Sequence, residues 1–93
     1  MADKILTLHP EGKKGVNIDL EKYNSIKKKL LDIIQANGEI TYQNLNKKAV
    51  TQLQGNFKGS ISWYVIMVKL DLEARGIIER LPDTNPQIIR IKN

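Results

Sequence analysis

The 93-residue sequence contains no cysteine and only one histidine, one tryptophan and one phenylalanine. Without cysteine, the chain can form neither a disulfide framework nor a thiolate metal site. His9 has no second histidine for a metal pair and no recognisable cysteine or carboxylate partner for catalysis. The composition therefore predicts a protein that is not an enzyme, with no catalytic residues, no cofactor and no metal.

Long apolar runs are also absent from the sequence. No stretch approaches the roughly 20 apolar residues of a membrane span, and Asp3 and Lys4 interrupt the mixed run at the start of the chain. The length suits one domain, close to the lower limit for a single core without disulfides or metals. We therefore expect a single cytoplasmic domain over residues 1–93, with no signal peptide and no membrane.

Charge of one sign is in excess. Fifteen Lys and Arg side chains outnumber ten Asp and Glu side chains, which leaves a formal net charge of +5. This surplus favours an anionic partner such as nucleic acid, although many cytoplasmic domains carry a similar charge as ordinary solvated surface.

Apolar residues at helical spacing predict three helices. Asp19, Thr41 and Ser60 each precede a periodic segment, and each can accept a hydrogen bond from a free N–H group of the first turn. Gly38 and Gly76 suit the backbone position that follows a helix end. The expected helices span about 19–38, 41–54 and 60–76.

Short β-prone segments lie around the helices. The candidate strands are 4–8, 39–40, 77–81 and 87–92, the last two joined by turn residues 82–86. We divide the chain into an N-terminal strand with a basic loop (1–18), three helices (19–76) and a C-terminal hairpin (77–93). This order predicts an α+β fold, a winged helix-turn-helix, in which the third helix is the recognition helix and the hairpin is the wing.

Two longer segments carry a family resemblance. HPEGKKGVNID (9–19) and KGSISWYVIMVKLDLEARGIIER (58–80), together with the overall length, resemble a small bacterial family of uncharacterised single-domain proteins. The resemblance covers essentially the whole chain and implies a winged-helix fold. It implies no catalytic or ligand-binding residue.

The third helix carries apolar residues on two opposite sides. One side, at about 100° per residue, carries Ile61, Val65, Val68 and Leu72, and the far side carries Trp63, Ile66, Met67, Leu70 and Ala74. Two narrow polar seams separate the sides, one with Ser62, Lys69 and Glu73 and the other with Asp71 and Arg75. Because the domain core covers one side only, something else must cover the other.

Three occupants of the far side remain open. The N-terminal segment with Ile5, Leu6 and Leu8 can fold back over it, a second copy of the chain can cover it in a homodimer, or another protein or ligand can bind there. We take Trp63, Ile66, Met67 and Leu70 as the interface residues. We expect Trp63 to be mostly covered in the native assembly, because so large an aromatic side chain rarely stays in water.

Candidate nucleic-acid contacts lie near the start of the third helix and on the wing. They are Lys58, Ser60, Ser62, Arg80, Arg90 and Lys92, all suited to phosphate groups. Lys13 and Lys14, in the loop between Gly12 and Gly15, form a second candidate anion-binding group, although the phosphate-loop motif is absent. The third helix itself lacks the Arg, Lys, Asn or Gln near its start that base readout usually needs.

Two functions are therefore expected. The first is a small DNA-binding regulator, a homodimer with duplex DNA as its partner. The alternative is a winged-helix protein-interaction or dimerisation module that does not bind DNA. Charge and fold favour the first, but fold alone does not establish function.

Overall fold

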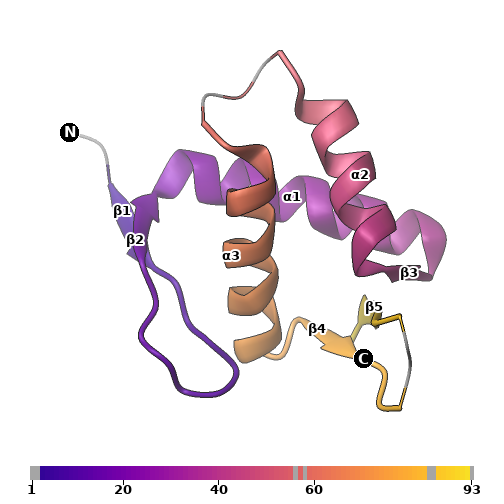
Figure 1. Cartoon of the computed structure of the whole chain (residues 1–93). Helices are drawn as coiled ribbons and strands as arrows, with labels where there is room; N and C mark the ends of the chain where they lie inside the picture. Colours follow the sequence, from indigo (N-terminus) through magenta and orange to yellow (C-terminus); the bar gives the residue numbers. More distant parts are fainter. Residues whose placement is uncertain (1–2, 56, 58, 84–85, 93) are drawn as a thin grey trace.

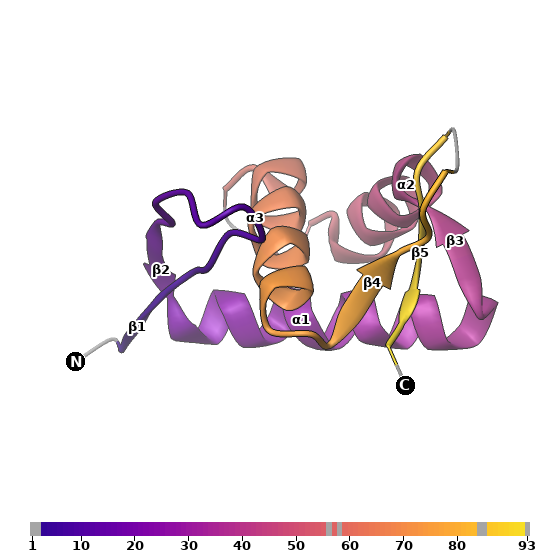
Figure 2. The ribbon, with the colours of Figure 1, turned by 90° about the horizontal axis from the view of Figure 1, so that it is seen from below.

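Figures 1 and 2 show a computed structural model of the chain, which describes residues 3–55, 57, 59–83 and 86–92. The helices are α1 (Leu20–Asn37), α2 (Tyr42–Leu53) and α3 (Ile61–Ala74). The strands are β1 (Lys4–Leu6), β2 (Asn17–Asp19), β3 (Glu39–Thr41), β4 (Ile78–Arg80) and β5 (Ile88–Ile91). The fold is α+β, with three helices and two small antiparallel sheets.

The predicted caps begin the three helices. Asp19 Oδ2 accepts a hydrogen bond from Lys22 N at 3.1 Å, and Thr41 Oγ1 accepts one from Asn44 N at 3.2 Å. Ser60 Oγ accepts one from Trp63 N at 3.3 Å. Each contact satisfies an N–H group that has no partner inside its helix, so the expected helix starts are confirmed.

The C-terminal sheet has the strand order β3-β5-β4. Ile40 pairs with Ile89, and Ile78 pairs with Ile91, so β5 lies between the short strand after α1 and the strand after α3. The expected hairpin strands at 77–81 and 87–92 are each shorter in the structure. Ile40, Ile78 and Ile89 are buried and attach the sheet to the helices.

The N-terminal sheet differs from the expectation of one strand and a flexible loop. Residues 17–19 form a second strand, β2, which pairs with β1 so that Ile5 lies opposite Ile18. Thr7 N also donates to Val16 O at 2.8 Å, which extends the hairpin. At Gly15, the last residue of the predicted basic loop, a Cβ would lie 1.7 Å from Thr7 O. Gly15 therefore allows the two backbones to approach closely.

The core lies where α3 and α2 pack on α1. Tyr23, Ile26, Leu30, Ile33 and Ile34 supply the α1 face, and Val65, Val68 and Leu72 supply the inner side of α3. Figure 1 shows α3 in front of α1, with the N-terminal hairpin on one side and α2 with the C-terminal strands on the other. Figure 2 gives the same order from below, so α3 has neighbours behind it and on both flanks.

Candidate interaction surface on the third helix

The charged side chains within α3 are all buried. Lys69 and Glu73 have side chains 6% exposed, and the side chain of Asp71 is 0% exposed. The sequence placed these residues in two polar seams between the apolar sides. The structure buries Lys69, Asp71 and Glu73 against neighbouring elements and leaves Ser62 and Arg75, the other members of the seams, exposed. A buried charge is stable only with partners, so each seam is a set of paired groups.

The seam with Asp71 faces the N-terminal hairpin. Asp71 Oδ1 accepts a hydrogen bond from Leu8 N at 2.8 Å, and Oδ2 accepts from Arg75 Nε at 2.8 Å and from the hydroxyl of Tyr23. Burial, and then the hydrogen bond to Asp71, raise the pKa of Tyr23 to about 12. One carboxylate therefore joins the N-terminal segment, α1 and the end of α3.

The seam with Glu73 faces α2 and the C-terminal sheet. Lys69 Nζ lies 2.9 Å from Glu73 Oε1, and Arg80 Nε from β4 lies 3.8 Å from the same oxygen. The Lys69 ammonium is also 5.4 Å from the centre of the Tyr42 ring on α2, a cation–π distance. Within the described residues Glu73 has ion pairs but no well-aligned hydrogen bond.

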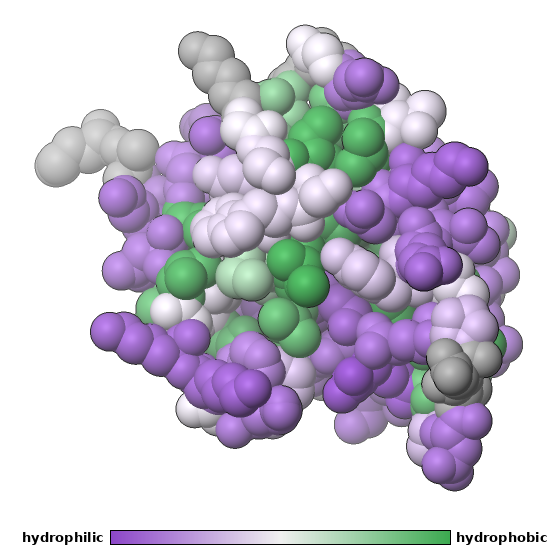
Figure 3. Space-filling view, viewed as in Figure 1, coloured by the Kyte–Doolittle hydropathy of each residue, from purple (hydrophilic) through white to green (hydrophobic). Residues whose placement is uncertain are grey.

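With the charges buried, α3 presents an apolar strip to solvent, which we call the α3 stripe: Trp63, Ile66, Met67, Leu70 and Ala74. Trp63 is 41% exposed and the other members are partly exposed. On the N-terminal segment, Leu8, whose N–H group bonds to Asp71 of α3, is 43% exposed, and Leu6 at the end of β1 is 53% exposed. Figure 3 shows green apolar residues over α3 in the middle of this face, with purple hydrophilic residues around them.

The N-terminal segment does not cover the whole of the α3 stripe, because Trp63 stays 41% exposed. The segment folds back beside α3, as one of the three alternatives expected. Its contact there is the hydrogen bond from Leu8 N to Asp71, and Leu6 and Leu8 stay exposed. Ile5 alone of the three packs against the core. The interpretation that this segment covers the far side within one chain does not hold for Trp63, and for the partly buried Ile66, Met67 and Leu70 it stays a prediction.

An aromatic cluster holds Trp63 at the start of the stripe. The Trp63 and Tyr64 rings meet edge to face at 4.9 Å, and Tyr64 meets Phe57 in the same way at 5.0 Å. Lys22 Nζ of α1 lies 5.4 Å from the centre of the Tyr64 ring. Edge-to-face contacts of this kind are worth about 0.5–1.5 kcal/mol each, so they favour this orientation of the exposed indole.

The predicted nucleic-acid contacts are spread along α3. Ser60 and Ser62 are exposed at its start, whereas Arg80 pairs with Glu73 near its end, about 20 Å away along the helix axis. Arg90 lies between Glu79, 2.7 Å from its Nε, and Glu39, 3.8 Å from its Nη1, so two carboxylates balance its charge. Lys92 is exposed after β5, and Lys58 lies outside the described residues.

The predicted anion loop is exposed beside α3. Lys13 and Lys14 are both exposed, and Lys13 Nζ is 3.6 Å from Glu11 Oε2. His9 Nδ1 accepts a hydrogen bond from Glu11 N at 3.1 Å, so the single histidine takes part in the local turn. Figures 1 and 2 show this loop next to the C-terminal half of α3.

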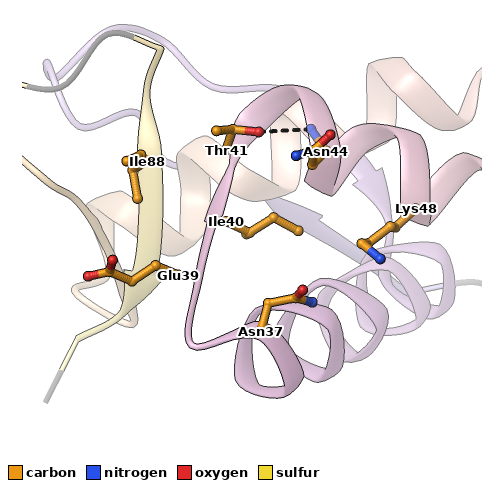
Figure 4. Close-up of a pocket in the computed structure, with 7 residues that line it drawn as sticks. All are labelled: Asn37, Glu39, Ile40, Thr41, Asn44, Lys48 and Ile88. Atoms are coloured by element: carbon orange, nitrogen blue, oxygen red, sulfur yellow. Dashed lines mark hydrogen bonds between the residues drawn. The ribbon is translucent and has the colours of Figure 1, made fainter.

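A polar hollow of about 300 Å³ lies away from the α3 stripe, between the end of α1, β3 and α2. Its lining residues, labelled in Figure 4, are Asn37, Glu39, Ile40, Thr41, Asn44, Lys48 and Ile88. Asn44 and Lys48 are one turn apart on α2, a spacing visible in the sequence but not singled out there. Glu39 and Lys48, on opposite sides of the lining in Figure 4, have opposite charges. Across the described residues, no group of His, Cys, Asp or Glu is suited to a metal ion.

Comparison with known proteins gives one match. A family model described as "Family of unknown function (DUF6958)" matches residues 4–89. The chain belongs to this family. The match agrees with the resemblance to a small uncharacterised family and leaves the role of that family open. Neither a curated protein nor a solved structure matches the chain. In the described part of the chain, no helix combines the length and apolar character that crossing a membrane requires.

Proposed function

We propose that this protein is a winged-helix protein-interaction module that binds its partner through the α3 stripe. The order of elements supports the winged-helix part. Helix, strand, two helices and a hairpin follow one another, and the strand after the first helix joins the hairpin in the order β3-β5-β4. In this arrangement β4 and β5 are the wing and α3 occupies the place of a recognition helix.

The observation that carries the proposal is the composition of the exposed side of α3. Base readout requires side chains such as Arg, Lys, Asn or Gln that reach the groove. In α3 the charged residues are buried in pairs, and the side chains left for a partner are Ser62 and the α3 stripe. Apolar and aromatic side chains on an exposed helix face are typical of a protein contact.

DNA binding by a dimeric regulator, the first function expected from the sequence, has less support. Its remaining basis is the net charge of +5 together with Ser60, Ser62 and Lys92, which stay exposed. Arg90 lies between two carboxylates, so a phosphate group would compete with existing ion pairs, whereas Arg80 shares the Glu73 carboxylate with Lys69. A homodimer in which a second copy of the chain covers the α3 stripe would also be a protein interaction through this surface.

Two measurements on the full chain test the function. Anisotropy of a labelled mixed-sequence duplex at physiological salt should show only non-specific binding, with Kd no tighter than about 10⁻⁶ to 10⁻⁴ M. The dye ANS should bind the native protein, and Leu70→Glu should lower its fluorescence at least threefold. The matched control Thr51→Glu, at an exposed position of α2, should not. Tighter duplex binding that Arg80→Glu with Arg90→Glu removes would contradict the proposal and restore the DNA-binding function.

A further inference from the structure

The α3 stripe has features that define the chemistry of its partner. We propose that the partner is a short amphipathic helix whose polar side is acidic. This inference rests on the proposed function, because it takes the α3 stripe as an interaction surface and assigns what binds there. Three properties of the surface support it, namely its size, the charges around it and the orientation of Trp63.

The size of the apolar surface suits one helix better than a second copy of the chain. From Trp63 to Ala74 the stripe is about 17 Å long, which is the length of three helical turns. With Leu8 beside it, the surface offers six apolar residues. Stable interfaces between two folded proteins use about 20–30 residues on each side, so these residues alone are too few for a stable dimer.

The charges around the stripe are predominantly positive. Lys13, Arg75 and Arg80 have side chains 68%, 35% and 51% exposed, and Lys14 is exposed beside Lys13. The carboxylates that balance the two arginines, Asp71 and Glu73, are buried beneath the surface. Together with Lys69, five cations stand against three carboxylates, those of Glu11, Asp71 and Glu73. An acidic helix is attracted to this rim, whereas a second copy of a chain with charge +5 is repelled.

The two ends of the stripe differ in what they offer. Trp63 is oriented by its contact with Tyr64 and presents an aromatic anchor, the residue type that most often dominates binding energy. Met67 and Leu70 continue the stripe toward the basic rim, and methionine adapts to irregular partner surfaces. A partner helix with apolar residues at spacings of three and four would therefore contact Trp63 with one end and place acidic residues beside Lys13 and Lys14 with the other.

Synthetic peptides test the proposal with the full chain. The probe is a fluorescein-labelled 18-residue peptide with leucines at spacings of three and four on one face and glutamates on the other. One control peptide has lysine in place of every glutamate, and a second keeps the composition but scatters the leucines around the helix. We expect the acidic amphipathic peptide to bind at least tenfold more tightly than either control. Because Trp63 is the only tryptophan in the chain, its emission should move to shorter wavelength as an unlabelled peptide covers it.

Matched variants locate the binding surface. Lys13→Glu with Lys14→Glu should weaken peptide binding at least fivefold and reduce its dependence on salt. Lys47→Glu with Lys48→Glu makes the same change of charge on exposed residues of α2 and should leave binding unchanged. Leu70→Glu should abolish binding while the circular dichroism spectrum keeps its helical signal.

The outcomes separate this inference from the proposed function. Equal binding of the lysine peptide, or equal loss in both lysine pairs, would overturn the acidic partner and leave the interaction module in place. A homodimer in sedimentation that Leu70→Glu converts to monomer would do the same and assign the stripe to a second copy. Absence of both peptide binding and stripe-dependent self-association would remove the inference together with the function it rests on.

Discussion

Asp71 is the residue on which the largest number of separate segments depend. Its carboxylate is fully buried and accepts hydrogen bonds from Leu8 N, the Tyr23 hydroxyl and Arg75 Nε. The first two donors are 63 and 48 residues away in the sequence. A buried carboxylate is stable only while such donors stay in place, so Asp71 ties the position of the N-terminal hairpin to α1 and α3.

The hydroxyl of Tyr23 should make stability depend on alkaline pH. Its pKa is raised to about 12 in the folded protein, above the ordinary value of 10.0. The folded state therefore holds the proton more tightly, so this contribution to stability is complete below about pH 10 and is lost as pH rises toward about 12. The expected loss is about 2–3 kcal/mol. Urea unfolding at pH 8, 10 and 11.5 should show it in wild type.

Tyr23→Phe provides the control for this prediction. The variant has no hydroxyl to titrate and leaves Asp71 with one donor fewer, so it should be less stable than wild type at pH 8. The difference between the two proteins should shrink as pH rises, because only wild type loses the Tyr23 contribution. A constant difference from pH 8 to pH 11.5 would show that the raised pKa of Tyr23 does not contribute to folding.

The role of Gly15 cannot be predicted from its neighbours in the sequence. Two glycines around two lysines predict a flexible loop, and Gly12, with a positive φ of 76°, agrees with a turn role. The role of Gly15 depends on Thr7, whose carbonyl occupies the space of a Cβ, and this contact exists only because β1 and β2 pair. Since β2 has only three residues and no clear alternation, the sequence does not predict that pairing.

Among the elements, α3 is stabilised by the ion pair between Lys69 and Glu73. The spacing of these two residues is visible in the sequence, but their burial is not. Glu73→Ala should leave the Lys69 ammonium buried without its carboxylate and cost about 3–5 kcal/mol. The double variant Lys69→Met with Glu73→Leu should recover most of this loss, because apolar side chains of similar volume need no partner. Thermal unfolding of the two variants beside wild type measures both effects. Equal stability of Glu73→Ala and wild type would mean that water solvates Lys69.

Helices are the part of this fold that the sequence predicts well. Asp19, Thr41 and Ser60 cap the expected segments, since a cap and its periodic apolar face are local properties of the chain. The two seams of α3 were visible as charged positions, but their burial depends on Leu8, Tyr42 and Arg80, which come from three other elements. Burial of charge depends on tertiary contacts, so it cannot be predicted from the sequence of one helix.

At the scale of the whole molecule, the sequence identified the α3 stripe but not what lies beside it. Helical spacing alone placed Trp63, Ile66, Met67 and Leu70 on one side. The exposure of Trp63 follows from the path of the N-terminal hairpin, which turns toward Asp71. The candidate nucleic-acid residues share a chemical type, yet the fold separates Ser60 from Arg80 and pairs Arg90 with two glutamates.

Deleting residues 1–8 tests how the hairpin contributes to the whole protein. The deletion removes β1 and the Leu8 N–H donor to Asp71, so we expect a loss of about 1–3 kcal/mol in the free energy of unfolding. Sedimentation should give the mass expected for the shortened chain in the same oligomeric state, because the deleted segment leaves Trp63 exposed. Unchanged stability on urea unfolding would show that the hairpin is not fixed by α3.

The carboxylate that binds the N-terminal hairpin belongs to Asp71, far along the chain. This separation in sequence affects the order of events during protein synthesis. At about 5–20 residues per second, β1 and β2 leave the ribosome several seconds before α3 does. In that interval the Leu8 N–H group and the Tyr23 hydroxyl have no Asp71 carboxylate to bind. The N-terminal hairpin therefore reaches its final place beside α3 only after α3 has been made.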